Sequence, residues 1–204
     1  MKRYGYSTKK SITDKVKKYF PNSYQEKIKE AKKNRKGYEY KLTKIKNNFD
    51  AYFVGLLMTD GYVTTRGIDV GIDLTDEDCI KFLSCSIGKN YKVYQNKNNN
   101  KNIFRLVLTD KELVNNVKRF GIVQNKSLIL QPPFLEPEEE KFLPYIIRGI
   151  IDGDGCVSPT SYGSPQFYIV SMSEPFIEWI KQVLENKLFL VDIHKRQCSS
   201  GIWK

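Results

Sequence analysis

The sequence predicts an α+β fold built from two similar halves, and two observations support this. The first is a repeated motif: the segment FVGLLMTDGYV at residues 53–63 is matched without gaps by IRGIIDGDGCV at 147–157. The second is that a helix and a strand pair follow each copy of the motif in the same order. A hydrophobic content of 40% and an aromatic content of 13% are typical of a packed core, not of a disordered chain.

The first half is expected to follow the order helix, two strands, helix, two strands, helix. Gly61 ends the first motif helix, and apolar residues at 68, 70, 72 and 74 alternate with more polar ones, as in a strand. The expected elements are a helix over 49–60, a strand pair that turns at Arg66-Gly67, a helix over 80–87 capped by 75–78, strands over 91–95 and 103–109 joined by a loop over 96–102, and a helix over 111–120.

A proline-rich connector over 121–137 leads to a second half that starts in the same way. Its expected elements are a motif helix over 138–154 begun or interrupted by Pro144, strands over 156–158 and 166–172, an amphipathic helix over 176–184, and a strand pair begun by residues 191–193 and 202–203. The second half then stops, whereas the first continues with a strand and a helix. We therefore expect it to lack its last elements, to be the less stable half and to expose large apolar residues: Phe176, Trp179, Ile180 and Trp203.

The net charge of +11 is concentrated near the N-terminus. Residues 1–48 contain 16 Lys or Arg and 4 Asp or Glu, whereas residues 49–204 contain 18 and 19. This asymmetry favours a polyanionic partner, and nucleic acid above all; a solvated tail that aids solubility is the alternative. We expect three regions: a basic extension over 1–48 that is helical around 24–35, a first half-domain with its connector over 49–137, and a second half-domain over 138–204.

Features of targeting and redox chemistry are few. No apolar run approaches the roughly 18 residues that span a bilayer, and no signal-peptide pattern opens the chain. The four cysteines form no C-x-x-C pair, and a single histidine, His194, accompanies them, which argues against a zinc site. Reduced thiols in a cytoplasmic protein are the expected state, in a bacterial, phage or organellar compartment.

Each motif helix ends in an aspartate that is followed by glycine. A carboxylate at a helix C-terminus lies against the negative end of the helix dipole, which is locally unfavourable. Because the arrangement occurs twice, at Asp60 and at Asp154, it favours a positive ligand there, and a metal cation is the natural candidate. The competing interpretation is that Asp-Gly is only a helix stop and that the glycines inside the helices are only packing positions.

The two motifs resemble the paired signature helices of LAGLIDADG homing endonucleases of the two-motif, single-chain type. The segment GIVQNKS at 121–127 also resembles the one that closes the first half in that family. The likeness covers residues 49–204. It implies two pseudosymmetric half-domains of the αββαββα type, which form a saddle of two antiparallel sheets around the packed motif helices. It further implies an intron-encoded, metal-dependent DNA endonuclease that acts as a monomer.

The resemblance also implies a catalytic centre where the motif helices end. Gly55 and Gly149 are expected at a close crossing of these helices, which brings the two motif aspartates together. The expected ligands for Mg²⁺ or Mn²⁺ are the carboxylates of Asp60 and Asp154 and the carbonyl groups of Thr59 and Gly153. Lys126 is the expected basic catalytic residue of the first half. Met58 in one helix matches Asp152 in the other, so that position is expected to be structural.

Double-stranded DNA is the expected partner, with the strands of the saddle facing its major groove. Strand alternation nominates outward-facing side chains: Arg66, Lys92, Tyr94, Lys97, Lys101 and Arg105 in the first half, and Gln166, Tyr168, His194 and Arg196 in the second. A solvated polar strand face would show the same pattern. Asp69 and Asp73 would place negative charge on this face unless they accept from cytosine amino groups or pair with Arg or Lys neighbours.

Two other functions on the same fold stay open. An RNA maturase would bind intron RNA through its basic surface and would need no metal-binding acids. A non-catalytic DNA-binding regulator would not need them either. The presence of both motif aspartates, Asp60 and Asp154, favours the nuclease.

Overall fold

The computed structural model describes residues 40–88, 93–98, 101–159, 165–187 and 194–203. All of them belong to one compact unit, Tyr38–Lys204. The helix expected around 24–35 lies outside the described residues. The compact unit begins earlier than expected, because Leu42 and Ile45 are each only 4% exposed and pack in the core. The described residues before 48, which were expected in the basic extension, therefore pack with the compact unit.

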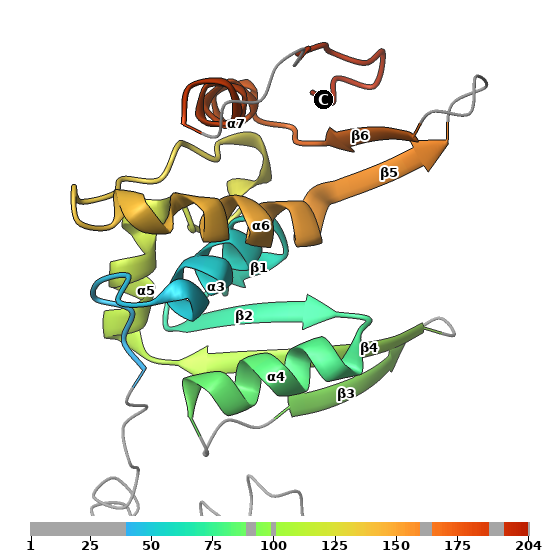
Figure 1. Cartoon of the computed structure of the whole chain (residues 1–204). Helices are drawn as coiled ribbons and strands as arrows, with labels where there is room; N and C mark the ends of the chain where they lie inside the picture. The colour runs from blue at the N-terminus through green and yellow to red at the C-terminus, as the bar shows by residue number, and fades with distance from the viewer. Residues whose placement is uncertain (1–39, 89–92, 99–100, 160–164, 188–193, 204) are drawn as a thin grey trace, which may run out of the picture. The chain divides into compact units, whose positions relative to one another are not determined.

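Residues 48–120 follow the predicted order of helices and strands (Figure 1). The elements are α3 (Asn48–Thr59), β1 (Gly61–Val63), β2 (Asp69–Leu74), α4 (Glu77–Ile87), β3 (Val93–Asn98), β4 (Lys101–Thr109), α5 (Lys111–Val117) and the 3-10 helix η1 (Lys118–Phe120). The loop expected over 96–102 is wrong, because β3 runs to Asn98 and β4 begins at Lys101. Asn and Lys have low strand propensity, but here they pair across the two antiparallel strands.

The helices of this half begin at residues that satisfy free backbone N–H groups. The side chain of Asn47 accepts from the N–H of Asp50 at the start of α3, and Asp76 does the same for Cys79 at the start of α4. Asp110 accepts from two N–H groups at the start of α5. Such caps stabilise a helix by about 1 kcal/mol each, and they account for the boundaries of the three helices.

The first half contains a four-stranded antiparallel sheet in the order β1-β2-β4-β3. Residues Val70 and Ile72 of β2 pair with Leu108 and Leu106 of β4, and these side chains are fully buried in the core. The alternate residues lie on the opposite, polar face of the sheet, where Asp73 pairs with Arg105 and Asp69 with Thr109. The sheet therefore has one face in the core and one face lined by charged and hydroxyl groups.

The second half contains α6, a two-stranded ribbon and α7. Its elements are a 3-10 helix η3 (Glu140–Phe142), α6 (Leu143–Asp154), β5 (Gly155–Pro159), β6 (Pro165–Ile169) and α7 (Glu174–Asn186). Pro144 lies in the first turn of α6, where its missing N–H is harmless. Of the expected last strand pair, residues 191–193 lie outside the described residues, and Trp203 forms single bridges with Ser171 and Gln197. The strand expected over 166–172 ends at Ile169.

The apolar residues expected to be exposed in the second half are covered, which corrects that expectation. Phe176 is fully buried, Ile180 is 3% exposed, and Trp179 and Trp203 are partly buried against the core. Phe176 and Trp179 stack with their ring centroids 5.9 Å apart. The second half is thus packed around α7 in spite of its small sheet.

The two motif helices, α3 and α6, pack side by side between the four-stranded sheet and the β5–β6 ribbon (Figure 1). Gly55 and Gly149 face each other at the crossing. A Cβ atom at Gly55 would collide with the carbonyl oxygen of Ile146 and lie 2.9 Å from the Cα of Gly149. A Cβ at Gly149 would collide with the carbonyl oxygen of Tyr52. The backbones are in direct contact, so only glycine fits at either position.

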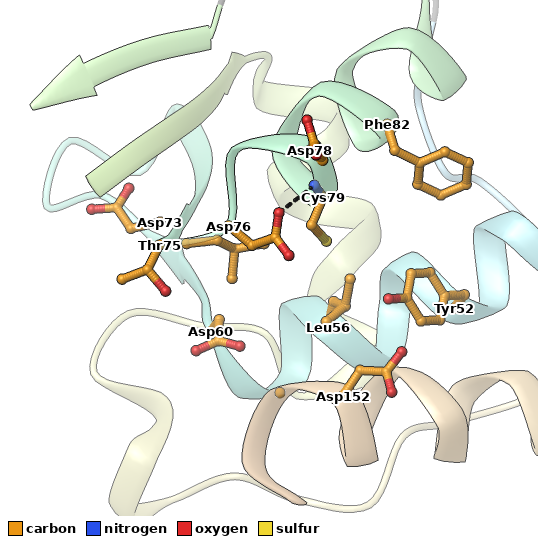
Figure 2. Close-up of a pocket in the computed structure, with 12 residues that line it drawn as sticks. Tyr52, Leu56, Asp60, Asp73, Thr75, Asp76, Asp78, Cys79, Phe82 and Asp152 are labelled. Carbon is orange, nitrogen blue, oxygen red and sulfur yellow. Dashed lines mark hydrogen bonds between the residues drawn. The ribbon is translucent and has the colours of Figure 1, made fainter. Parts of the chain in front are cut away.

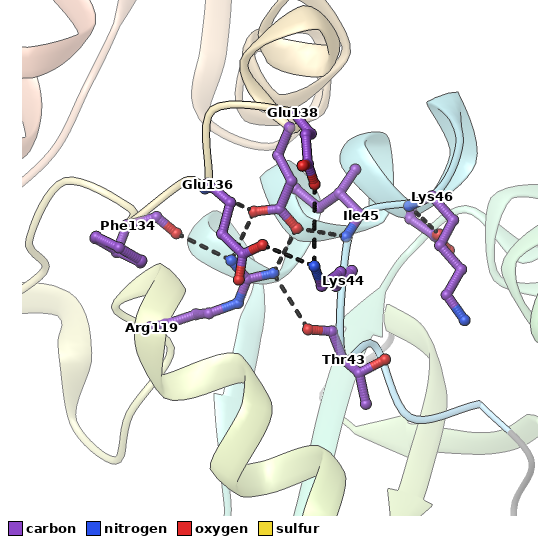
Figure 3. A network of polar contacts seen from close by, with 10 residues as sticks. Thr43, Lys44, Ile45, Lys46, Arg119, Phe134, Glu136 and Glu138 are labelled. Atoms are coloured by element: carbon purple, nitrogen blue, oxygen red, sulfur yellow. Dashed lines mark hydrogen bonds and ion pairs between the residues drawn. The ribbon is translucent and has the colours of Figure 1, made fainter.

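Residues 40–46 form a strap that packs beside Arg119 and the segment around Glu136 (Figure 3). Glu139, 2% exposed, accepts from the backbone N–H of Ile45 at 2.7 Å and from both terminal nitrogens of Arg119 at 2.6 Å. Burial alone would raise the pKa of Glu139, but the hydrogen bonds from Arg119 and from two backbone N–H groups lower it to about 2. Lys44 pairs with Glu136 beside this cluster.

In the part of the chain that the structure describes, no helix is both long enough and apolar enough to cross a bilayer. The four cysteines are all free thiols.

Candidate metal centre and nucleic-acid interface

The two motif aspartates lie where α3 and α6 end. Asp60 follows the last residue of α3, and its N–H still donates to the carbonyl oxygen of Leu56 at 2.9 Å. Asp154 is the last residue of α6, and Gly155 then turns the chain into β5. Each carboxylate therefore stands at the negative end of a helix, as the sequence predicts.

The crossing at the two glycines brings these helix ends into contact. A Cβ atom placed on Gly153 of α6 would collide with Oγ1 of Thr59 and would lie 2.9 Å from Oδ2 of Asp60. The hydroxyl of Thr59 itself donates to the carbonyl oxygen of Leu56 at 3.0 Å and so points back along α3. The end of α6 thus rests directly against the carboxylate that ends α3.

The electrostatics connect the two carboxylates, because the charge of Asp60 acts on Asp154. Burial raises the pKa of Asp154 to about 6, with the negative charge of Asp60 as the second cause and Lys126 opposing the shift. Burial also raises the pKa of Asp60, against the influence of Lys126 and a hydrogen bond from Thr59. Both acids are therefore held in a place where their charged forms are poorly solvated, which is the condition that a bound cation relieves.

Lys126 lies at the same place, brought there by the connector. Its side chain is buried, and Nζ donates a hydrogen bond to the carbonyl oxygen of Thr59 at 2.7 Å. Burial lowers the pKa of Lys126, while Asp154 and Asp60 raise it. Asn125 positions the lysine by adopting a left-handed conformation, with φ of 55°, immediately before the 3-10 helix Lys126–Leu128. Asparagine tolerates this conformation better than most residues.

The donor set fits a hard divalent cation. It consists of two carboxylates, of which Asp60 raises the pKa of Asp154, with backbone carbonyl groups beside them. Oxygen ligands of this kind suit Mg²⁺ and Mn²⁺. Among the described residues, neither this site nor any other brings together three acidic, histidine or cysteine side chains that could hold a metal ion. Asp60 and Asp154 can therefore supply only part of a coordination shell, and water or substrate oxygens must complete it. Lys126 already engages the carbonyl group of Thr59, one of the expected ligands.

A cavity of about 710 Å³ opens beside the helix ends (Figure 2). Its lining is strongly acidic: Asp60 from α3, Asp152 from α6, Asp73 at the end of β2, and Asp76 and Asp78 at the start of α4. Tyr52 and Leu56 of α3 and Phe82 of α4 add apolar surface. The cavity gives solvent access to Asp60, and its charge would attract cations.

The two residues at the earlier motif position have different surroundings. Met58 of α3 is 1% exposed and lies in the core. Asp152 of α6 has a side chain that is 41% exposed, and its Oδ2 lies 3.9 Å from Nε of Arg148. Burial raises the pKa of the neighbouring Tyr52, and Asp152 raises it further. Asp152 therefore faces the acidic cavity with Tyr52 and Arg148 as neighbours.

The nominated DNA-facing residues have different surroundings. Arg66 and Tyr94 are largely exposed, and Arg105 forms an ion pair with Asp73 on the polar face of the sheet. In the second half Gln166, His194 and Arg196 are exposed, whereas Tyr168 is partly buried and interacts with Cys156. Lys92 lies outside the described residues, and the side chains of Lys97 and Lys101 lie outside them too.

Sequence reasoning missed the way in which Asp69 and Asp73 are neutralised. Asp69 is fully buried and accepts from Thr64 at 2.9 Å, Thr109 at 2.7 Å and Arg66 at 2.7 Å. Asp73 accepts from Arg105 and from the hydroxyl of Tyr62. Strand alternation predicts that Asp69 and Asp73 lie on the polar face, and pairing with arginine is one of the expected ways to neutralise them. The partners Tyr62, Thr64 and Thr109 carry no signal in the sequence, because strand pairing brings them together.

The structure resembles those of LAGLIDADG homing endonucleases. It matches the homing endonuclease I-WcaI, solved bound to its DNA recognition sequence, with a TM-score of 0.50 and 13% identity, over 86% of this chain and 79% of that one. Mesophilic variants of the homing endonuclease I-DmoI match with a TM-score of 0.48 and 15% identity, over 76% of this chain and 86% of theirs. No protein-family model and no curated protein matches the sequence. At such identities the likeness establishes a shared fold of helices and antiparallel sheets.

Proposed function

We propose that this protein is a site-specific endonuclease for double-stranded DNA, which hydrolyses phosphodiester bonds with divalent cations held by Asp60 and Asp154. One observation carries the proposal: the glycine crossing of α3 and α6 brings the two helix-end carboxylates together beside a buried lysine. A simple helix stop does not explain why two acids lie close together, because the charge of one disfavours the charged form of the other.

The roles of the residues follow from their chemistry. Asp60 and Asp154 would hold Mg²⁺ or Mn²⁺, with the carbonyl groups of Thr59 and Gly153 as further ligands. The chemistry that such a cation supplies is the activation of water and the neutralisation of charge on phosphate oxygens. Lys126, with Nζ on the carbonyl oxygen of Thr59, adds a fixed positive charge near both acids. That charge would stabilise the extra negative charge of the transition state.

The remaining surface suits a long DNA site. The four-stranded sheet and the β5–β6 ribbon lie on either side of the motif helices, and we propose that they form a saddle across the duplex with the metal centre at its middle. The polar face of the first sheet presents Arg66, Tyr94 and Arg105. The basic segment before residue 38 would add affinity for phosphates that does not depend on sequence. We propose that the protein acts as a monomer encoded within an intron, so that the insertion junction is its target.

The first test is to select a binding site and then to assay cleavage. The full chain would be incubated in EDTA with a randomised library of duplex DNA, and the enriched site would then be offered with Mg²⁺, with Mn²⁺ or with EDTA. We expect double-strand cleavage at one position, which depends on the cation. Binding of a site without cleavage in either cation would identify a DNA-binding regulator instead. Enrichment from a library of intron RNA, but not from DNA, would identify a maturase.

A further inference from the structure

The polar face of the first sheet contains two aspartate–arginine pairs of unlike construction. Arg105 of β4 makes two hydrogen bonds to Asp73 of β2, from Nε to Oδ1 at 2.8 Å and from Nη2 to Oδ2 at 2.5 Å. Arg66, in the turn before β2, makes a single contact, from Nη2 to Oδ2 of Asp69 at 2.7 Å. The side chain of Arg105 is 41% exposed and that of Arg66 is 69% exposed.

A third residue, Tyr62, also binds the aspartate of the Asp73–Arg105 pair. The hydroxyl of Tyr62, on β1, donates to Oδ1 of Asp73 at 3.2 Å. The ring of Tyr62 reaches that place by lying across Gly71, where a Cβ atom would collide with the ring. A glycine in the middle of a strand weakens it. Gly71 is nevertheless needed in β2, because any side chain there would occupy the space of the Tyr62 ring. Asp73 thus has hydrogen-bond partners on both sides, and it cannot swing away from Arg105 without losing them.

This arrangement leaves a defined set of donors free. A guanidinium has five N–H donors in a rigid planar fork, and Asp73 takes the one on Nε and one on Nη2. The hydroxyl of Tyr62 also lies near this guanidinium, but among the described residues no acceptor is found for the two donors on Nη1 or for the second on Nη2. One hydrogen on each terminal nitrogen is the pair that binds the O6 and N7 acceptors of guanine side by side in the major groove. The fork is therefore oriented with the correct edge free.

The charge of the pair also favours a base over a phosphate. Asp73 neutralises Arg105 locally, so the pair as a unit offers little net charge to the DNA backbone. Hydrogen-bond donors that are fixed in direction still discriminate between bases, since a base that lacks the matching acceptors leaves them unsatisfied. Arg66 is also paired with an aspartate, but it is more exposed and is held at one nitrogen. Because Asp69 keeps Thr64 and Thr109 as partners, Arg66 can turn from it to a phosphate.

We propose that Arg105, fixed by Asp73, Tyr62 and Gly71, reads one guanine of the target site, while Arg66 contacts a phosphate. The proposal rests on the function proposed above. Asp73 also lines the cavity that contains Asp60, so the guanine lies close to the cleaved bonds and not at the end of the site. Three of the four acceptor positions of Asp73 are used by Arg105 and Tyr62, which favours a role in supporting Arg105 over acceptance from a cytosine amino group.

The experiment is selection from a randomised duplex library in EDTA by the full chain and by four variants. Wild type is expected to enrich a site that contains one guanine whose preference falls by about 5-fold to 150-fold in Arg105→Ala and Arg105→Lys, with the other positions unchanged. Arg105→Lys keeps the charge but cannot form the fork, so it decides the matter if the alanine variant is unstable. Asp73→Asn should weaken the preference at the same position.

Arg66→Ala is the matched control. It should lower affinity for all sequences alike and reduce the dependence of log K on log salt concentration by about 0.9, as the loss of one phosphate contact does. If both Arg105 variants enrich the same site as wild type with the same guanine preference, the inference is wrong although the proposed function stands. If wild type enriches no site at all, the proposed function is wrong and this inference falls with it.

Discussion

Nζ of Lys126 donates a hydrogen bond to the carbonyl oxygen of Thr59 at 2.7 Å, one residue before the aspartate that ends the first motif helix. The lysine comes from the connector between the halves, far from Thr59 in the sequence. Its charge lowers the pKa values of both Asp60 and Asp154 below what burial alone would give. The connector is therefore part of the site and not only a link between two half-domains.

Replacing this lysine should change how the metal-free protein responds to pH. The pKa of Asp154 is raised from 3.8 to about 6, so the folded state favours its neutral form. Because the folded state binds this proton more tightly than the unfolded state, Asp154 contributes to the free energy of unfolding. That contribution is fully present below pH 3.8 and is lost as the pH rises through about 6. In Lys126→Met the pKa of Asp154 should rise further, and the loss should extend to higher pH.

The measurement is the melting temperature in EDTA from about pH 4 to pH 8. For wild type and for Lys126→Met, the melting temperature of the same protein with Asp154→Asn added is subtracted, so that the contributions of other titrating groups cancel. Lys118→Met, at an exposed position of the 3-10 helix after α5, is the matched control and should follow wild type. A Lys126→Met profile that coincides with wild type would show that the lysine does not act on the aspartates.

The helix crossing predicts a large effect of added volume. Gly55→Leu or Gly149→Leu forces a side chain into a contact between two backbones, where even a Cβ atom collides with a carbonyl oxygen. Overpacking typically costs roughly 1–3 kcal/mol, and a rigid backbone contact should place these variants at the upper end. Urea unfolding measures the change, with Ser86→Leu on the exposed side of α4 as the control. Unfolding midpoints equal to that of wild type would mean that the glycines do not meet.

The strap over 40–46 predicts an acid-sensitive attachment at Glu139. Its pKa is lowered from 4.5 to about 2, so the stability it contributes is present above pH 4.5 and is lost as the pH falls through about 2. A shift of this size corresponds to about 3 kcal/mol. Glu139→Gln should therefore lower the free energy of unfolding at pH 7 by an amount of this order. Glu138→Gln, at a neighbour that is 82% exposed, should change it by less than about 0.5 kcal/mol. Equal effects of the two variants would contradict a special role for Glu139.

The basic segment predicts a loss of affinity without a loss of sequence preference. Residues 1–37 contain 13 Lys or Arg and 3 Asp or Glu. A deletion should end before Tyr38, because a longer one would remove the strap and its buried Leu42 and Ile45. We expect weaker binding to all DNA alike and a shallower salt dependence, since each lost phosphate contact removes about 0.9 from the log–log slope. Retained affinity together with a changed selected site would instead identify a segment that reads bases.

The motif helices could be predicted from the sequence because their signals are local. Each is an apolar run with an internal glycine and a terminal Asp-Gly, and two copies in one order predict a pair. The caps at Asp76 and Asp110 are local in the same sense. The strap could not be predicted, because its lysines resemble the tail before it and only Leu42 and Ile45 distinguish it.

The remaining errors and omissions concern long-range contacts. The ends of β3 and β4 cannot be predicted from one strand alone, because cross-strand pairing overrides the low strand propensity of Asn and Lys. The Tyr62–Asp73–Arg105 unit joins three strands, and no periodicity within one strand reports it. The burial of Phe176 depends on how α7 packs against the rest of the core, which the amphipathic pattern of the helix does not specify.

The central claim is that Asp60 and Asp154 share one catalytic cation site, and the most direct test is cleavage of the selected DNA by three variants. Asp60→Asn and Asp154→Asn should each reduce cleavage in Mg²⁺ by at least about 100-fold, because each weakens a metal site that supplies several kcal/mol of transition-state stabilisation. Both variants should still bind the site in EDTA. Asp152→Asn, two residues earlier on α6 and exposed, should cleave like wild type. Wild-type rates for Asp60→Asn or Asp154→Asn, or a loss in Asp152→Asn as large as theirs, would contradict the account.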